Sequence, residues 1–113
     1  MLKGPEIEKM TGKKGVVMEV VRLSAQEDDT VLIDLQRYVS PKGKLSTAQL
    51  GDVAQTHFAI RVYDLDSAYK RLRSSVDFLS EPVVFKLDFG TVKVVFLRDP
   101  DGAIVELSEV RED

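Results

Sequence analysis

The sequence predicts an α+β protein built from two related modules, each with the order strand, helix and three strands. Two observations indicate this class. Residues 55–109 pass through strand-like and helical patterns in that order. In addition, residues 15–35 resemble residues 90–107, which indicates two copies of one unit. Because residues 1–14 are polar and irregular, we expect the first βαβββ module to lack its opening strand and helix.

We place the boundary between the modules at the end of a polar linker. Residues 1–54 hold the incomplete first module and the linker, and residues 55–113 hold the complete second module. The linker contains Ser40-Pro41-Lys42-Gly43-Lys44, whose Pro and Gly interrupt regular structure. The chain has 113 residues. We expect one structural domain that buries roughly two-thirds of the surface its unfolded chain exposes.

The composition excludes several classes of function. The net charge is −3 and both signs are scattered, so the chain has no basic stripe for nucleic acid and no cationic helix for a membrane surface. Cysteine is absent, which excludes disulfides, thiolate metal ligands and a cysteine nucleophile. No apolar run resembles a signal peptide or a membrane span. We therefore expect a cytoplasmic protein that binds a small molecule and neither nucleic acid nor membrane.

The first half reads as a hairpin. Residues 16–23 are almost continuously apolar, which predicts a strand buried on both faces. Residues 26–29 should form the hairpin turn, and residues 31–36 a second strand that carries Asp34. Before this hairpin we expect at most a short strand near Ile7.

The second half begins with a strand at residues 56–62 whose side chains alternate between two faces. One face is apolar and consists of Phe58, Ile60 and Val62, and the other consists of His57, Ala59 and Arg61.

An amphipathic helix follows, for which Asp64 or Asp66 is the predicted N-cap. Its apolar positions are Leu65, Ala68, Tyr69, Leu72 and Val76. Three strands complete the module, at residues 83–89, 91–97 and 104–108. Between the last two strands, Asp99-Pro100-Asp101-Gly102 is typical of a turn rather than of a catalytic motif.

The internal repeat places two carboxylates at equivalent positions. When Gly15 is aligned with Gly90, Asp34 falls near Glu106, at spacings of 19 residues (34 − 15) and 16 residues (106 − 90). The longer hairpin of the first copy can absorb the difference.

These residues resemble the second module of the vicinal oxygen chelate superfamily. The similar segments are His57-Phe58-Ala59-Ile60-Arg61-Val62, Asp64-Leu65-Asp66, Ala68-Tyr69, Phe96 to Gly102, and Val105-Glu106-Leu107. The superfamily includes glyoxalase I, methylmalonyl-CoA epimerase, extradiol dioxygenases, fosfomycin-resistance enzymes and bleomycin-resistance proteins. The resemblance implies paired modules of the glyoxalase/bleomycin-resistance kind.

The resemblance also implies a divalent metal site. In such proteins, the first and last strands of each module supply ligands, and the matching positions here are His57, Glu106 and Asp34. The position of a fourth ligand lies on the opening strand that the first module lacks. Imidazole and carboxylate ligands suit Mn, Fe, Co, Ni, Zn or Mg. Such a metal can polarise a substrate carbonyl, after which a carboxylate such as Glu106 can move a proton as the catalytic base.

Each of these residues also has a purely structural interpretation. His57 can be a hydrogen-bonded surface histidine, and Glu106 and Asp34 can lie on exposed strand faces. Arg61 shares the face of His57 and is a candidate substrate contact for an anionic group. Tyr69 has helical spacing and is better explained as a core residue.

Two classes of function remain open. The first is a metal-dependent isomerase, lyase or dioxygenase that acts on a small molecule with adjacent oxygens. The second is a non-catalytic small-molecule binder similar to the bleomycin-resistance proteins.

We also expect a homodimer. The incomplete first module leaves an unpaired strand edge and an uncovered apolar face, both of which favour pairing with another chain.

Overall fold

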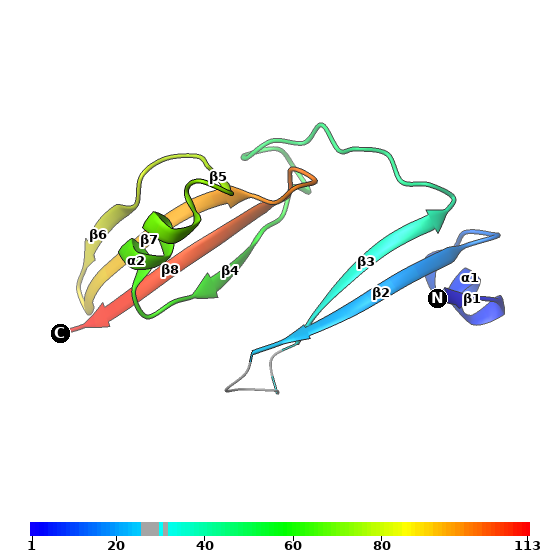
Figure 1. Ribbon diagram of the computed structural model, residues 1–113, viewed down its shortest axis with the longest axis horizontal. Helices are drawn as coiled ribbons and strands as arrows, with labels where there is room; N and C mark the ends of the chain where they lie inside the picture. The colour runs from blue at the N-terminus through cyan, green and yellow to red at the C-terminus, as the bar shows by residue number, and fades with distance from the viewer. Residues whose placement is uncertain (26–29, 31) are drawn as a thin grey trace. The chain divides into compact units, whose positions relative to one another are not determined.

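The computed structural model describes residues 1–25, 30 and 32–113 (Figure 1). The turn predicted at residues 26–29 lies outside the described residues. The chain divides into two compact units, Met1–Leu45 and Ser46–Asp113. No helix in the described part of the chain is long and apolar enough to cross a membrane.

The first unit is a three-stranded antiparallel sheet with one helix. Its elements are β1 (Leu2–Lys3), α1 (Pro5–Thr11), β2 (Val17–Ser24) and β3 (Leu32–Ser40), and the strand order is β1-β2-β3. The expectation of irregular structure before residue 15 is wrong, because α1 forms there. Pro5 lies in its first turn, and Gly12 ends it in the left-handed conformation, with φ 68° and its N–H bonded to the Glu8 carbonyl at 2.9 Å.

The core of the first unit lies on one face of its sheet. Ile7 of α1 packs against Val16 and Met18, which are each 1% exposed, and Val20 and Tyr38 lie at the margin of this cluster. The prediction that residues 16–23 are buried on both faces is wrong, because α1 covers only one face. On the other face, Val21, Leu23 and Leu35 are 53%, 46% and 55% exposed.

The second unit has the predicted βαβββ order with one additional short strand. Its elements are β4 (Phe58–Arg61), α2 (Leu65–Leu72), β5 (Asp77–Phe78), β6 (Val83–Leu87), β7 (Gly90–Arg98) and β8 (Ile104–Glu112). β4 lies parallel to β8, and β8 is antiparallel to β7. β5 and β6 both pair with the other edge of β7.

A comparison of the two units shows which strand is not present in the described part of the first one. In the second unit the opening strand β4 adds to the edge of β8 in parallel. In the first unit the short β1 instead pairs antiparallel with β2. Among the described residues, no strand occupies the equivalent edge of β3. The described part of the first unit therefore has no strand equivalent to β4.

Helix α2 covers one face of the second sheet (Figure 1). The Asp64 carboxylate caps the helix by accepting a hydrogen bond from the Ser67 N–H at 3.1 Å. Leu65 is fully buried and packs against Val95 and Leu107. The helix ends at residue 72, before the predicted contact at Val76.

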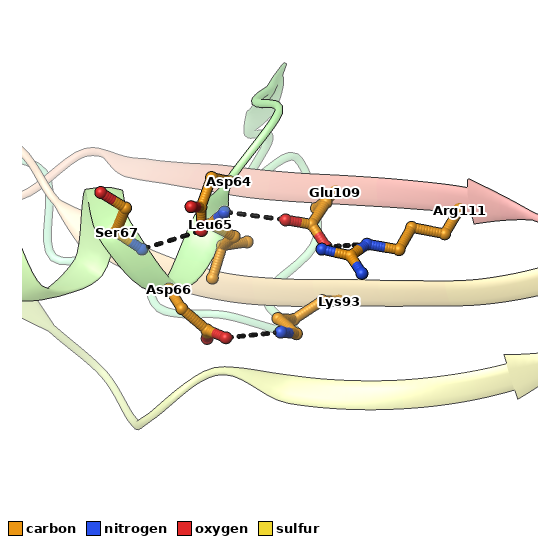
Figure 2. A network of polar contacts seen from close by, with 7 residues as sticks. All are labelled: Asp64, Leu65, Asp66, Ser67, Lys93, Glu109 and Arg111. Atoms are coloured by element: carbon orange, nitrogen blue, oxygen red, sulfur yellow. Dashed lines mark hydrogen bonds and ion pairs between the residues drawn. The ribbon is translucent and has the colours of Figure 1, made fainter.

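A buried carboxylate anchors the beginning of α2. Glu109 of β8 is only 4% exposed, and its Oε1 accepts a hydrogen bond from the Leu65 N–H at 3.0 Å (Figure 2). Its second oxygen accepts a bond from Arg111 at 3.0 Å. Beside it, Lys93 donates to Asp66 at 2.7 Å, and this hydrogen bond lowers the pKa of the Asp66 carboxyl. Two strand residues thus hold the first turn of α2 on the sheet.

We predict that Glu109→Ala destabilises the protein by about 1 to 3 kcal/mol, because it leaves the buried Leu65 N–H without an acceptor. Glu109→Gln retains an acceptor oxygen and should cost less. Glu112→Ala, at an exposed position of the same strand, is the matched control. The measurement is urea unfolding of each variant, and equal losses for Glu109→Ala and Glu112→Ala would contradict this role.

Candidate functional site

The second sheet has one face covered by α2 and one face that we call the open face. Side chains alternate along a strand, so residues between the α2-facing positions point to the open face. The cross-strand register places there Ala59 and Arg61 of β4, Glu106 and Ser108 of β8, Val94 and Phe96 of β7, and Val83 and Phe85 of β6.

The structure brings His57 and Glu106 together on this face. Ala59 lies opposite Glu106 in the parallel ladder, and His57 precedes Ala59 by two residues, so its side chain points to the same side. The His57 Nε2 atom lies 3.6 Å from Glu106 Oε1. Both side chains are partly covered, with 35% and 23% of their surface exposed. The pair is therefore close enough to act on one bound group and remains accessible to it.

Phe96 supports the histidine ring. Its ring centroid lies 5.0 Å from that of His57, and the two planes meet at 84°, in the edge-to-face arrangement that aromatic rings favour. In the antiparallel ladder, Phe96 lies directly opposite Glu106. In the sequence, Phe96 belongs to a predicted strand and to a segment that resembles the superfamily, but no sequence pattern gives it a role beside His57. The number of residues between Phe96 and the turn at residues 99–102 could have identified it, because that number determines which residue of the next strand lies opposite Phe96.

That turn sets the register of the site. The Asp99 carboxylate accepts hydrogen bonds from the N–H groups of Asp101 and Ala103 at 2.9 and 2.8 Å. The Asp99 N–H bonds to the Ala103 carbonyl at 2.8 Å. Gly102 has φ 90°, which residues with a side chain rarely adopt. These bonds confirm that residues 99–102 form a turn.

The donor atoms at this place fit part of a metal site. An imidazole nitrogen and a carboxylate oxygen are ligands of first-row divalent ions, with bond lengths of about 2.0–2.2 Å. Two ligands of one ion then lie roughly 3 to 3.5 Å apart, close to the separation of His57 and Glu106. Within residues 1–25, 30 and 32–113, no three His, Cys, Asp or Glu side chains converge on one point. The described residues thus offer two ligands.

Asp34 lies in the first unit and is held by an arginine. Arg22 donates to both of its carboxylate oxygens, at 2.7 and 3.0 Å. The hydrogen bond from Arg22 is the main reason why the pKa of Asp34 lies below its usual value. To bind a metal, Asp34 would have to give up this bidentate pair. Its role as a ligand stays a prediction.

Arg61 lies on the open face but away from His57. The two residues are four positions apart in the sequence, which corresponds to roughly 13 Å along an extended strand. Arg61 borders a surface hollow of about 380 Å³ whose other lining residues are Val62, Tyr63, Glu109, Val110 and Arg111. A ligand that contacted both Arg61 and His57 would have to extend along β4. Its role as a substrate contact therefore also stays a prediction.

No protein-family model and no curated protein matches this sequence. Solved structures match at low identity. A glyoxalase family protein from Bacillus cereus has a TM-score of 0.78 and 20% identity, over 96% of this chain and 72% of that chain. A glyoxalase/bleomycin resistance protein/dioxygenase from Alicyclobacillus acidocaldarius has a TM-score of 0.53 and 18% identity, over 96% and 83%. An integron cassette protein from the mobile metagenome of V. cholerae has a TM-score of 0.51 and 24% identity, over 92% and 80%.

These structures show that the chain has the fold of the glyoxalase/bleomycin-resistance proteins. The fold expected from the resemblance to the vicinal oxygen chelate superfamily is thereby confirmed. At these identities the likeness concerns the fold alone.

Proposed function

We propose that this protein is a glyoxalase-like protein that binds a divalent metal through His57 and Glu106 and acts on a small molecule with adjacent oxygens. The observation that carries the proposal is the 3.6 Å approach of these two side chains on the open face. The imidazole and the carboxylate come from the two strands, β4 and β8, that the parallel ladder joins. The Phe96 ring holds the imidazole from the neighbouring strand.

The reaction class follows from these donors. A divalent ion bound there would polarise a substrate carbonyl and make the adjacent C–H more acidic. Glu106 has two carboxylate oxygens, so one can serve as a ligand while the other accepts that proton. Returning a proton to the opposite face of the same carbon gives epimerisation, and returning it to the neighbouring carbon gives isomerisation, with no other reactant consumed. The Phe96 ring holds the imidazole of His57 in position.

A second candidate is a binder without catalysis, similar to the bleomycin-resistance proteins. Two observations favour it. The described residues supply only two converging metal ligands. The open face also exposes apolar side chains of β6, with Val83 45%, Phe85 52% and Leu87 48% exposed. Such a surface can hold a small apolar molecule.

Metal binding separates the two candidates. We predict that Mn²⁺, Co²⁺ or Ni²⁺ binds with modest affinity, at no more than one ion per chain, because two protein ligands leave the remaining positions to water. His57→Ala should abolish binding, whereas Glu112→Gln, at an exposed position of β8, should leave it unchanged. The measurement is calorimetric titration of protein purified without chelators. The absence of heat with all three metals would favour the binder.

Proton transfer tests the enzyme itself. We predict that the metal-loaded protein exchanges deuterium from solvent into the carbon next to the carbonyl of a suitable substrate, and that Glu106→Gln stops this exchange. Mass spectrometry of a panel of hemithioacetals, acyl-CoA thioesters and catechols provides the measurement. Exchange that persists in Glu106→Gln would show that Glu106 is not the base.

We further propose that the protein forms a homodimer through the free edge of β3. This edge has no partner strand among the described residues, and unpaired backbone groups favour pairing with a second chain. Alternate residues of an edge strand point their N–H groups outward. A proline at one of two consecutive positions therefore blocks pairing between chains without breaking the bonds to β2.

For this dimer, we predict that one of the variants Gln36→Pro and Arg37→Pro is a folded monomer and that the unsubstituted chain is a dimer. Light scattering at micromolar concentration, together with circular dichroism, provides the measurement. A stable monomer of the unsubstituted chain would contradict the homodimer.

A further inference from the structure

The two long hairpins, β2 with β3 and β7 with β8, have matching cross-strand pairs. Arg22 lies opposite Asp34 as Phe96 lies opposite Glu106. Counting along the strands from these pairs gives three further equivalences. The pair of Val21 and Leu35 corresponds to the pair of Val95 and Leu107, and the pair of Leu23 and Ile33 corresponds to the pair of Leu97 and Val105. The pair of Glu19 and Arg37 corresponds to the pair of Lys93 and Glu109.

The equivalent apolar side chains differ sharply in burial. Val95 and Leu107 are 2% and 6% exposed beneath α2. Their counterparts Val21 and Leu35 are 53% and 55% exposed. We call the surface formed by Val21, Leu23, Ile33 and Leu35 the bare face. Its residues have the composition of a helix-covered core, yet no helix among the described residues of the first unit covers them.

Helix α1 does not fill this role, because it packs on the opposite side of the same hairpin. Its Ile7 contacts Met18, and Val20 and Tyr38 lie beside that contact. Met18 and Val20 alternate with Val21, so they point away from the bare face. Within the second unit, α2 is already committed, since Leu65 is fully buried on its own sheet. A helix that covers the bare face therefore has to be one other than α1 and α2.

The charges beside the bare face indicate how such a helix would lie. In the second unit, Glu109 accepts the Leu65 N–H at the start of α2, and Lys93 pairs with Asp66 in its first turn. In the first unit, Arg37 occupies the place of Glu109, and Glu19 that of Lys93. Both signs are thus reversed. Glu19 and Arg37 pair with each other, and their side chains are 40% and 74% exposed, so both are accessible.

The reversed charges fit a helix that runs in the direction opposite to that of α2. A helix carries partial positive charge at its N-terminus and partial negative charge at its C-terminus. Glu109 suits an N-terminus, whereas Arg37 can donate to the free carbonyls of a C-terminus. Glu19 can pair with a basic residue in the last turn of that helix, as Lys93 pairs with an acidic residue in the first turn of α2.

We propose that the bare face is a docking site for an amphipathic helix of another polypeptide, which binds with its basic C-terminal turn at Glu19 and Arg37. The apolar side of this helix covers Val21, Leu23, Ile33 and Leu35. It therefore runs in the direction opposite to that of α2 on the second sheet.

The test uses a synthetic fluorescent peptide with the sequence of residues 63–76 as the probe, since it has apolar residues at helical spacing and basic residues near its end. Fluorescence anisotropy should show saturable binding to the full chain. Leu35→Asp should weaken binding at least about tenfold, because it removes apolar area from the contact. Val53→Asp, at a loop position that is 98% exposed, is the matched control and should bind as the unsubstituted chain does.

The direction of the helix is tested by changing charges on both partners. A peptide with Glu in place of Lys70 and Arg71 should bind several-fold more weakly, and Glu19→Lys in the chain should restore its binding. A peptide with Lys in place of Asp66 should bind as well as the original. If the peptide with Lys in place of Asp66 binds much more weakly than the original peptide, the proposed direction of the helix is overturned. Absence of binding, or loss of dimers in Val21→Asp seen by sedimentation, would overturn the proposed occupant, because Val21 belongs to the bare face but lies on the middle strand β2, away from the β3 edge.

Discussion

The second unit depends on the position of β8 between two different neighbours. On one side, β8 pairs antiparallel with β7, and the Asp99 turn sets that register. On the other side, β8 pairs in parallel with β4, which begins far earlier in the chain. Glu106 lies where these two ladders meet. The same strand therefore determines that Phe96 lies beside it and that His57 reaches it from the other side.

A second constraint is that a sheet with apolar residues on a face needs something to cover that face. In the second unit α2 does so, and Glu109 and Lys93 hold its first turn in place (Figure 2). The same strand, β8, thus contributes Glu106 to the open face and the buried Glu109 to the helix side. The polar groups that anchor the helix and the polar groups of the candidate site are kept apart by the sheet itself.

The two carboxylates that the repeat made equivalent have different surroundings for a physical reason. Opposite Glu106 stands Phe96, which carries no charge, and His57 arrives from β4. Opposite Asp34 stands Arg22, and no described strand lies on the far side of β3. A carboxylate next to a guanidinium forms a bidentate pair. The cross-strand neighbour of each carboxylate, Arg22 in one hairpin and Phe96 in the other, therefore gives the two carboxylates different chemistry.

The sequence by itself determined the order of strands and helix in the second module, the residues of α2 that face the sheet and the turn at residues 99–102, because periodicity and turn chemistry act over a few neighbouring residues. It also singled out His57 and Glu106 as candidates. Only the tertiary structure decided that these two side chains meet, that a register shift between Val17 and Met18 brings Arg22 rather than Leu23 opposite Asp34, and that α1 covers one face alone. Register and helix placement result from contacts between residues far apart in the chain, and no local pattern encodes them.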